Sequence, residues 1–405
     1  MTVLDRFLKY VSFDTRSDEN SESFPSTAKQ LVLGKELALE LERIGLINVG
    51  LDENGYVYGF LPASPDRENE KTLGLVAHMD TSPDVSGENA KPSLVDYEGG
   101  DITLANGEKI RESVFPCLKN YVGQKLVVTD GNTLLGADDK AGIAEIFTAL
   151  EYLVNNPNVS HRGISVCITP DEEIGQGADR FPYARFGASE AYTIDGCALG
   201  EIEYENFNAA GATFSIKGVN IHPGAAKGKM KNAILVANKI ISQLPENETP
   251  ATTEGYEGFF HVTDIEGNES AAEIRMLIRD HDIDKFSARK DYLYKLESFI
   301  NSLYGEGTVT LKIKDSYFNM KEKILPVMYL IDNAKAAMEK CGVTPDIVPI
   351  RGGTDGARLS YEGVPCPNLS TGGENAHSIH EFVPVPALEK MVDVIILLTT
   401  MKGEN

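Results

Sequence analysis

The sequence predicts an α/β fold in which a largely parallel or mixed sheet, flanked by helices, is interrupted by an inserted α+β sandwich domain of order βαββαβ. Three observations predict this fold. Strand and helix patterns alternate over the first 200 residues, their order changes between about 209 and 318, and alternation then resumes. We therefore expect a discontinuous main domain, residues 1–208 and 319–405, and an inserted domain, residues 209–318.

The N-terminal alternation consists of short apolar runs and one long stretch with helical spacing. Apolar runs typical of strands buried on both faces occur at 73–77, 125–129, 164–168 and 191–194. Residues 142–154 have apolar side chains at helical spacing. Elements in the order βαβα usually form a parallel sheet covered by helices.

The middle of the chain follows a different order. Strands are expected at 212–218, 258–266, 271–279 and 308–314, and helices at 232–244 and 284–303. This βαββαβ order is typical of a small α+β sandwich. A strand at 346–350 then precedes a Gly-rich turn, and a helix at 387–401 closes the main domain.

Composition and charge narrow the functional classes. The net charge of −23 disfavours nucleic acid and anionic membranes as partners. The five cysteines form no CxxC pair, which is typical of a reducing compartment. The N-terminus has no signal-peptide pattern, and no run of about 18 apolar residues could span a membrane. We expect a cytoplasmic protein.

Acidic and histidine clusters lie just past four of the expected strands. They contain His78 and Asp80, Asp138 and Asp139, Asp171, Glu172 and Glu173, and Asp195; a fifth cluster, with His377 and His380, follows a Gly-Gly turn near the C-terminus. Ligands of open α/β sheets bind outside the carboxyl ends of the strands. Each cluster alone is better explained by a solvated loop, a helix cap or a surface pair, but their shared topological position predicts a cation site.

The available side chains restrict the metal. Two imidazoles with three carboxylates suit zinc, and less selectively cobalt or manganese. Five ligands are too many for one open catalytic ion, so they predict two ions that share a bridging carboxylate.

Three segments around these clusters resemble the di-zinc exopeptidase family, which includes carboxypeptidase G, aminoacylase and succinyl-diaminopimelate desuccinylase. They are AHMDTSPD at 77–84, LGADDKAG at 135–142 and TPDEEIG at 169–175. Further segments resemble the tripeptide aminopeptidases of that family: EYENFNA at 203–209, HPG at 222–224, TEGYEG at 253–258 and PIRGGTDGA at 349–357. The likeness runs nearly from end to end.

The resemblance assigns the ligands of two Zn²⁺ ions per subunit. It implies that His78 and Asp195 hold one ion, that Glu173 and His377 hold the other, and that Asp138 bridges them. Cobalt or manganese are the expected substitutes. The spacing of His377 from the Gly-Gly turn favours it over His380 as the ligand.

Glu172 and Asp80 are the expected catalytic residues. On an extended chain Glu172 and Glu173 would point to opposite sides, so that one binds metal and the other faces the substrate. The family pattern makes Glu172 the general base that takes a proton from a metal-activated bridging water. Asp80, two residues after His78, can bond the free ring nitrogen of that histidine and fix its tautomer.

Substrate contacts are expected from four residues. By resemblance, His222 stabilises the developing oxyanion, from its own or the neighbouring subunit. Arg279 and Arg351 are alternatives for clamping a substrate carboxylate, and Asn232 is a weaker substrate candidate. The inserted domain would act as a hinged lid and as the surface of a homodimer.

These expectations predict a metallo-aminopeptidase that hydrolyses the N-terminal residue from tripeptides. One alternative keeps the site and changes the substrate, giving an N-acyl amino acid deacylase or a dipeptidase. Another is a non-catalytic, metal-stabilised binding protein, against which Glu172 argues because a structural site needs no base.

Overall fold

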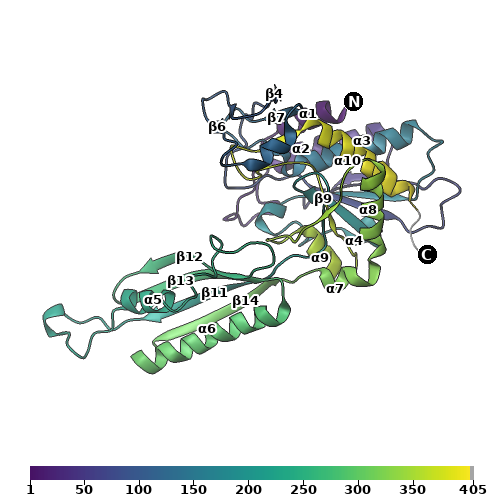
Figure 1. Ribbon diagram of the computed structural model, residues 1–405. Coiled ribbons are helices and arrows are strands. Elements are labelled where there is room, and N and C mark those ends of the chain that lie inside the picture. Colours follow the sequence, from purple (N-terminus) through teal and green to yellow (C-terminus); the bar gives the residue numbers. More distant parts are fainter. Residues whose placement is uncertain (402–405) are drawn as a thin grey trace. The chain divides into compact units, whose positions relative to one another are not determined.

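The computed structural model describes residues 1–401 and divides the chain into two compact units (Figure 1). Of the described residues, unit 1 comprises Met1–Tyr204, Glu322–Val348 and 354–401, and unit 2 comprises Glu205–Lys321 and Pro349–Gly353. The expected insertion, 209–318, lies within unit 2, which also takes up five residues from far along the chain. Among the described residues, no helix is long and apolar enough to cross a membrane.

Unit 1 contains an eight-stranded mixed sheet with the strand order β1-β2-β8-β3-β9-β16-β10-β15. Its strands are β1 (Ile47–Leu51), β2 (Val57–Leu61), β3 (Leu73–His78), β8 (Ile164–Thr169), β9 (Glu190–Gly196), β10 (Glu201–Glu203), β15 (Asp346–Ile347) and β16 (Asn368–Ser370). The central strands β8, β3, β9 and β16 run parallel to one another, so their carboxyl ends meet at one edge. The mixed sheet predicted from the sequence is confirmed.

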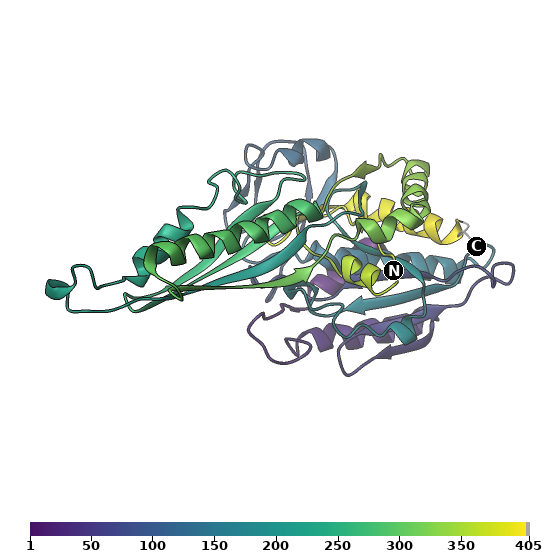
Figure 2. The same cartoon turned by 90° about the horizontal axis from the view of Figure 1, so that it is seen from below.

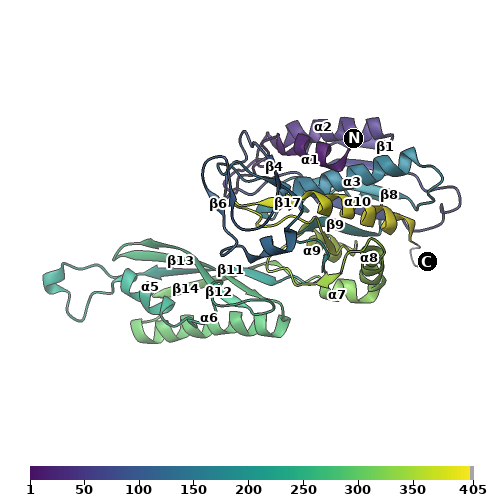
Figure 3. The same cartoon turned by 45° about the horizontal axis from the view of Figure 1, so that its top comes forward.

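Helices cover both faces of this sheet, as Figures 1 and 3 show. One face carries α2 (Gln30–Ile44) and α3 (Ala137–Asn155), against which α1 (Val3–Val11) and α10 (Val385–Thr400) pack. The other face carries α4 (Tyr183–Phe186) and α9 (Asp355–Tyr361) over a core that includes Phe181 and Phe186. The helix α8 (Tyr329–Lys340) packs against α10. Every residue of β3 and β8 is buried, as a strand covered on both faces requires.

Two smaller sheets complete unit 1. One has the order β17-β7-β4, from β17 (Phe382–Pro384), β7 (Lys125–Val128) and β4 (Ser93–Asp96), and the other pairs β5 (Ile102–Thr103) with β6 (Lys109–Ile110). They share a core with Tyr97 and Leu118. Besides α4, residues 1–401 contain these short helices: η1 (Pro116–Tyr121), η2 (Glu172–Ile174), η3 (Pro223–Ala225), η4 (Leu325–Val327) and α7 (Lys321–Ile324).

Unit 2 is a four-stranded antiparallel sheet of order β12-β13-β11-β14 with two helices on one face (Figure 2). Its elements, in chain order, are β11 (Asn208–Lys217), α5 (Ala233–Ile241), β12 (Phe259–Gly267), β13 (Ala271–Asp280), α6 (Ile283–Tyr304) and β14 (Val309–Tyr317). Alternate residues of β11 and β13 face the helices and form the core with Phe286 and Leu293. The predicted βαββαβ order is confirmed.

Two predicted strands differ from the structure. The run 125–129 forms β7, which pairs antiparallel with β4 and β17 and not with the main sheet, because an apolar run does not specify its partners. The strand predicted at 346–350 ends at Ile347. Pro349 has no N–H to donate to a ladder, and Ile350 pairs with Asn206 in unit 2.

Candidate metal centre

Three of the predicted clusters lie together at the carboxyl edge of the main sheet. His78 is the last residue of β3, Asp195 lies near the end of β9, and Glu172 and Glu173 form the η2 turn that follows β8. Because β8, β3 and β9 are parallel neighbours, their ends bring these side chains into one place.

Asp138 does not follow a strand of this sheet, contrary to the expectation. It lies at the start of α3, about ten residues beyond β7. The buried carboxylate of Glu381 holds its loop by accepting N–H groups of Leu135, Gly136 and Asp138 at 2.7, 2.8 and 3.1 Å. The next carboxylate, Asp139, accepts the N–H of His78 at 3.1 Å and that of Gly142 at 3.2 Å. The loop is therefore fixed by residues distant in sequence.

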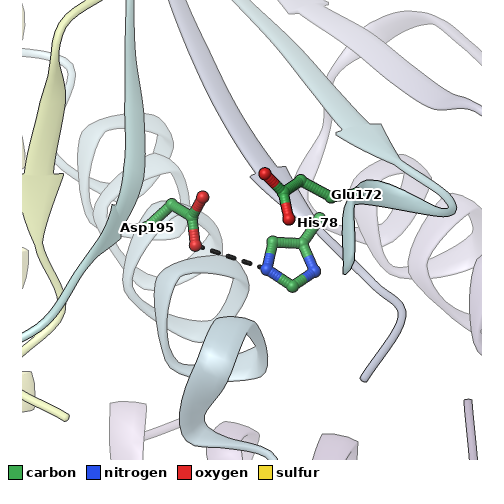
Figure 4. A group of neighbouring side chains, drawn as sticks. All are labelled: His78, Glu172 and Asp195. Carbon is green, nitrogen blue, oxygen red and sulfur yellow. Dashed lines mark ion pairs between the residues drawn. The ribbon is translucent and has the colours of Figure 1, made fainter. Parts of the chain in front are cut away.

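The donor atoms of the five expected ligands converge. His78 Nε2 lies 2.9 Å from Asp138 Oδ1 and 3.3 Å from Asp195 Oδ1, the latter contact being drawn in Figure 4. His377 Nε2 lies 2.8 Å from Glu173 Oε2 and 3.2 Å from Asp138 Oδ2. Asp138 thus uses one oxygen toward each histidine, which is the arrangement that a bridging carboxylate needs.

The donor set fits divalent cations. Donor atoms of His78, Asp138 and Glu173, and likewise those of His78, Glu172 and Asp195, lie within 4.8 Å of one another. Oε1 of Glu173 is buried without a hydrogen-bond partner within residues 1–401. Oxygen and imidazole ligands converging on one point, with an unsatisfied buried carboxylate oxygen, are what a zinc-type ion requires.

The charges of the site perturb one another strongly. Burial, and then the neighbouring carboxylate of Asp138, raises the pKa of Glu173 to about 8. Bonds to Asp138 and Glu173 raise the pKa of His377 to about 11. Burial and the nearby Asp195 raise the pKa of Glu172 well above its ordinary value. A bound cation stabilises the ionised form of carboxylates that are crowded together in this way.

Glu172 and Glu173 lie on the one-turn helix η2, so the extended chain expected there is wrong. Left-handed backbone at Asp171 (φ 56°) and Gly175 (φ 71°) begins and ends the turn. Asp80 holds the turn, because its carboxylate oxygens accept the N–H groups of Glu172 at 3.0 Å and Glu173 at 3.2 Å.

Asp80 also contacts His78, as the sequence led us to expect. The ring atom Nδ1 of His78 lies 3.1 Å from the backbone oxygen of Asp80 and 3.3 Å from its Oδ1. Asp80 is fully buried, and Nε2 of the same ring faces Asp138 and Asp195. Asp80 therefore orients both a predicted ligand and the turn that carries the predicted base.

The four predicted substrate residues belong to unit 2. His222 is exposed, and its Nδ1 accepts the N–H of Gly224 at 3.2 Å. Asn232 caps α5, and it borders a hollow of about 570 Å³ that His222 also lines. Nη1 of Arg279 donates to the backbone oxygen of Arg351 at 3.0 Å.

The guanidinium of Arg351 has internal partners. It lies over the rings of Phe207 and Phe259, 5.2 and 5.7 Å from their centroids. It also donates to the backbone of Gly255 and Glu257 and to Thr253. The role of Arg351 and of the other three in substrate binding stays a prediction.

Sequence reasoning missed two carboxylates that position the site. Glu381, the residue after His380, has no role in the sequence prediction, although it fixes the loop of Asp138. Asp171 accepts from the backbone and hydroxyl of Ser26 and from Gln30, and so anchors the turn that carries Glu172. The signal was present, since both acids adjoin predicted functional residues, but their partners are far away in sequence.

Comparison with known proteins gives consistent matches. Residues 204–308 match the family model described as a peptidase dimerisation domain. Peptidase T of Caldanaerobacter subterraneus is 52% identical over all of this chain and 99% of its own, and that of Halothermothrix orenii is 54% identical over 97% of each chain. The crystal structure of aminopeptidase PepT from Bacillus cereus, 25% identical, covers 98% of this chain and 97% of its own with a TM-score of 0.77.

The mixed sheet carries imidazole and carboxylate donors at its carboxyl edge, and a dimerisation-type α+β unit interrupts its domain in the sequence. This combination defines a metallopeptidase with an inserted domain. The relatives narrow this class. With more than half of its residues identical along nearly the whole length, the chain belongs to the peptidase T family.

Proposed function

We propose that this protein is a two-metal aminopeptidase that removes the N-terminal residue from tripeptides. The observation that carries the proposal is the convergence of His78, Asp138, Glu173, Asp195 and His377 beside Glu172. Full-length likeness to peptidase T supports the substrate. We propose two Zn²⁺ ions per subunit, for which cobalt or manganese could substitute.

In this proposal His78 and Asp195 would hold one ion, Glu173 and His377 would hold the other, and Asp138 would contribute to both. When bound, the ions polarise the scissile carbonyl and make water more acidic. Glu172 takes the proton from the attacking water and delivers it to the nitrogen of the departing dipeptide. Asp80 keeps Glu172 in place through the backbone N–H of the η2 turn.

Unit 2 supplies the proposed substrate contacts. Because Nδ1 of His222 accepts the N–H of Gly224, its ring proton is on Nε2, from which it can donate to the developing oxyanion of its own or the neighbouring subunit. Arg279 is the stronger candidate for the substrate carboxylate, since its buried Nε has no hydrogen-bond partner within residues 1–401. Asn232, the other predicted substrate residue that borders the hollow of His222, is proposed to contact the substrate backbone.

We also propose a cytoplasmic homodimer formed through unit 2. The match to a dimerisation domain supports this, as do the exposed apolar side chains of Ile234 and Leu235 on α5 and Ile265 on β12. All five cysteines are free, as in proteins of a reducing compartment. Sedimentation of the wild type and of Leu235→Glu checks the assembly: the first should be a dimer and the second a monomer.

The activity test compares kcat/KM for tripeptides, dipeptides and N-acetylated tripeptides. Free tripeptides should be cleaved fastest, and equal or reversed rates would refute the tripeptide claim. Glu172→Gln should keep both metals and lose turnover, whereas Glu53→Gln, an exposed control, should behave as wild type. Full activity of Glu172→Gln would remove Glu172 from the mechanism.

A further inference from the structure

The two histidines of the metal centre share an arrangement. Each ring directs Nε2 toward the ligand carboxylates and Nδ1 toward an aspartate of the segment 80–84. For His78 that aspartate is Asp80, at 3.3 Å from Nδ1. For His377 it is Asp84, whose Oδ2 lies 3.4 Å from Nδ1.

The turn that carries Asp84 is held firmly. The hydroxyl of Ser82, which is buried, donates to Asp84 Oδ2 at 3.0 Å and accepts the N–H of Asp84 at 3.2 Å. The guanidinium of Arg16 donates to the backbone oxygen of Pro83. The turn that carries this carboxylate is thus held by its own hydrogen bonds and by a residue of the N-terminal segment.

His377 needs an external partner more than His78 does. The side chain of His78 is 2% exposed and closes a strand, whereas that of His377 is 43% exposed and lies in a loop with its backbone at φ 61°. Loop residues are less restrained than strand residues. A carboxylate that accepts the second N–H of an imidazole fixes its tautomer and its ring orientation.

We propose that Asp84 is a positioning residue for His377. By accepting the N–H at Nδ1 it keeps the lone pair of Nε2 directed at the space between Asp138 and Glu173, and so sets the affinity of the metal position that His377 completes. The inference rests on the proposed two-metal site and goes beyond it, because it assigns a function to a carboxylate outside the ligand set.

Another function for Asp84 is open to test. It borders a hollow of about 440 Å³ together with Arg16 and Lys29, so it could bind the α-ammonium group of a substrate. The contact with His377 favours the positioning role, because Asp84 Oδ2 lies 3.4 Å from Nδ1 of a predicted ligand. A substrate role would change KM for free peptides and leave metal binding untouched.

The experiment measures metal binding by the full-length protein. Metal-free wild type, Asp84→Ala and Asp84→Asn are titrated with Zn²⁺ in a calorimeter, and the Nδ1–H signal of His377 in the Zn²⁺-loaded state is followed by NMR in ¹⁵N-histidine-labelled protein. Asp96→Asn is the matched control, because Asp96 is a similarly exposed carboxylate that pairs with Lys125 on a different sheet.

We expect Asp84→Ala to weaken the binding of the second ion about 10- to 100-fold and to leave the first step unchanged. Asp84→Asn, which keeps an acceptor oxygen, should lose less affinity for the second ion, and Asp96→Asn should bind both ions as the wild type does. In Zn²⁺-loaded Asp84→Ala the Nδ1–H of His377 should exchange with water faster than in the wild type, because it has lost its acceptor.

Two results would overturn the proposal: both binding steps of Asp84→Ala equal to wild type, or a raised KM for free tripeptides with unchanged metal affinity. Failure of the proposed function is visible separately, in the wild type. A wild type that binds two ions and cleaves no tripeptide refutes the substrate but still tests Asp84. A wild type that binds fewer than two ions refutes both proposals.

Discussion

Asn206 and Asn319 are bonded to each other where the chain enters and leaves unit 2: the N–H of Asn206 donates to Oδ1 of Asn319 at 3.2 Å. The side chain of Asn206 accepts the N–H of Met320 at 2.7 Å and donates to the backbone oxygens of Phe207 and Phe318. Both asparagines are buried. Two segments more than a hundred residues apart in sequence are therefore joined by amide groups shielded from water.

Replacing Asn206 by alanine should destabilise the protein by roughly 2–4 kcal/mol, because two buried backbone groups and one part-buried group lose a partner. Denaturant unfolding measures the change. The control Asn220→Ala removes an exposed amide that bonds to Glu269, and it should change stability by less than about 0.5 kcal/mol. Equal stability of the two variants would mean that the buried network contributes nothing.

The sequence predicted the elements near the site well, for a physical reason. Strands β3, β8 and β9 are covered on both faces, so their apolar runs are continuous. The polar residues of the site lie at the end of these runs or shortly after them, where the sequence shows them directly. His78 and Asp195 could therefore be placed at one sheet edge from their local pattern.

Other features depend on contacts that no local pattern contains. The loop of Asp138 is closed by Glu381, 243 residues away. The turn at Glu172 is set by the left-handed backbone of Asp171 and Gly175, and Asp171 is anchored by Ser26 and Gln30. Such long-range hydrogen bonds decide the geometry of the site, and a chain pattern indicates neither their partners nor their directions.

Glu381→Gln should weaken metal binding while leaving the fold intact. A glutamine replaces one acceptor oxygen by a donor NH₂ group, which repels the N–H groups of Leu135, Gly136 or Asp138. We expect a loss of about 10- to 100-fold in affinity, measured by competition with a zinc chelator. Glu389→Gln, an exposed change on α10, is the control. Wild-type affinity in Glu381→Gln would show that the loop of Asp138 does not need this carboxylate.

Metal removal should lower thermal stability as well as abolish activity, because a ligand that binds only the folded state stabilises it. At a free metal concentration 100 times Kd, the gain is about 2.7 kcal/mol. Scanning calorimetry with EDTA, and again after Zn²⁺ is restored, measures the shift of Tm. His377→Ala removes one predicted ligand, so its Tm should shift less than that of the wild type when Zn²⁺ is removed or restored. An unchanged Tm of the wild type in EDTA would argue against the two-metal site.

The burial of Glu145 should make the stability of the protein depend on pH, and this effect does not involve the metal centre. This residue of α3 is fully buried, and neither carboxyl oxygen has a hydrogen-bond partner within residues 1–401. Burial raises its pKa well above the ordinary value of 4.5, so the folded protein keeps the proton that the unfolded chain releases. Its stabilising contribution is complete below pH 4.5 and is lost as pH rises toward the folded-state pKa, by at most about 1.4 kcal/mol per pH unit.

Glu145→Gln, which cannot ionise, should therefore match the wild type near pH 5 and be the more stable protein near pH 8. Urea unfolding across that range measures the difference, with the exposed Glu98→Gln as a control that should follow the wild type at every pH. Parallel stability curves for the wild type and Glu145→Gln would mean that Glu145 ionises in the folded protein as easily as in the unfolded chain.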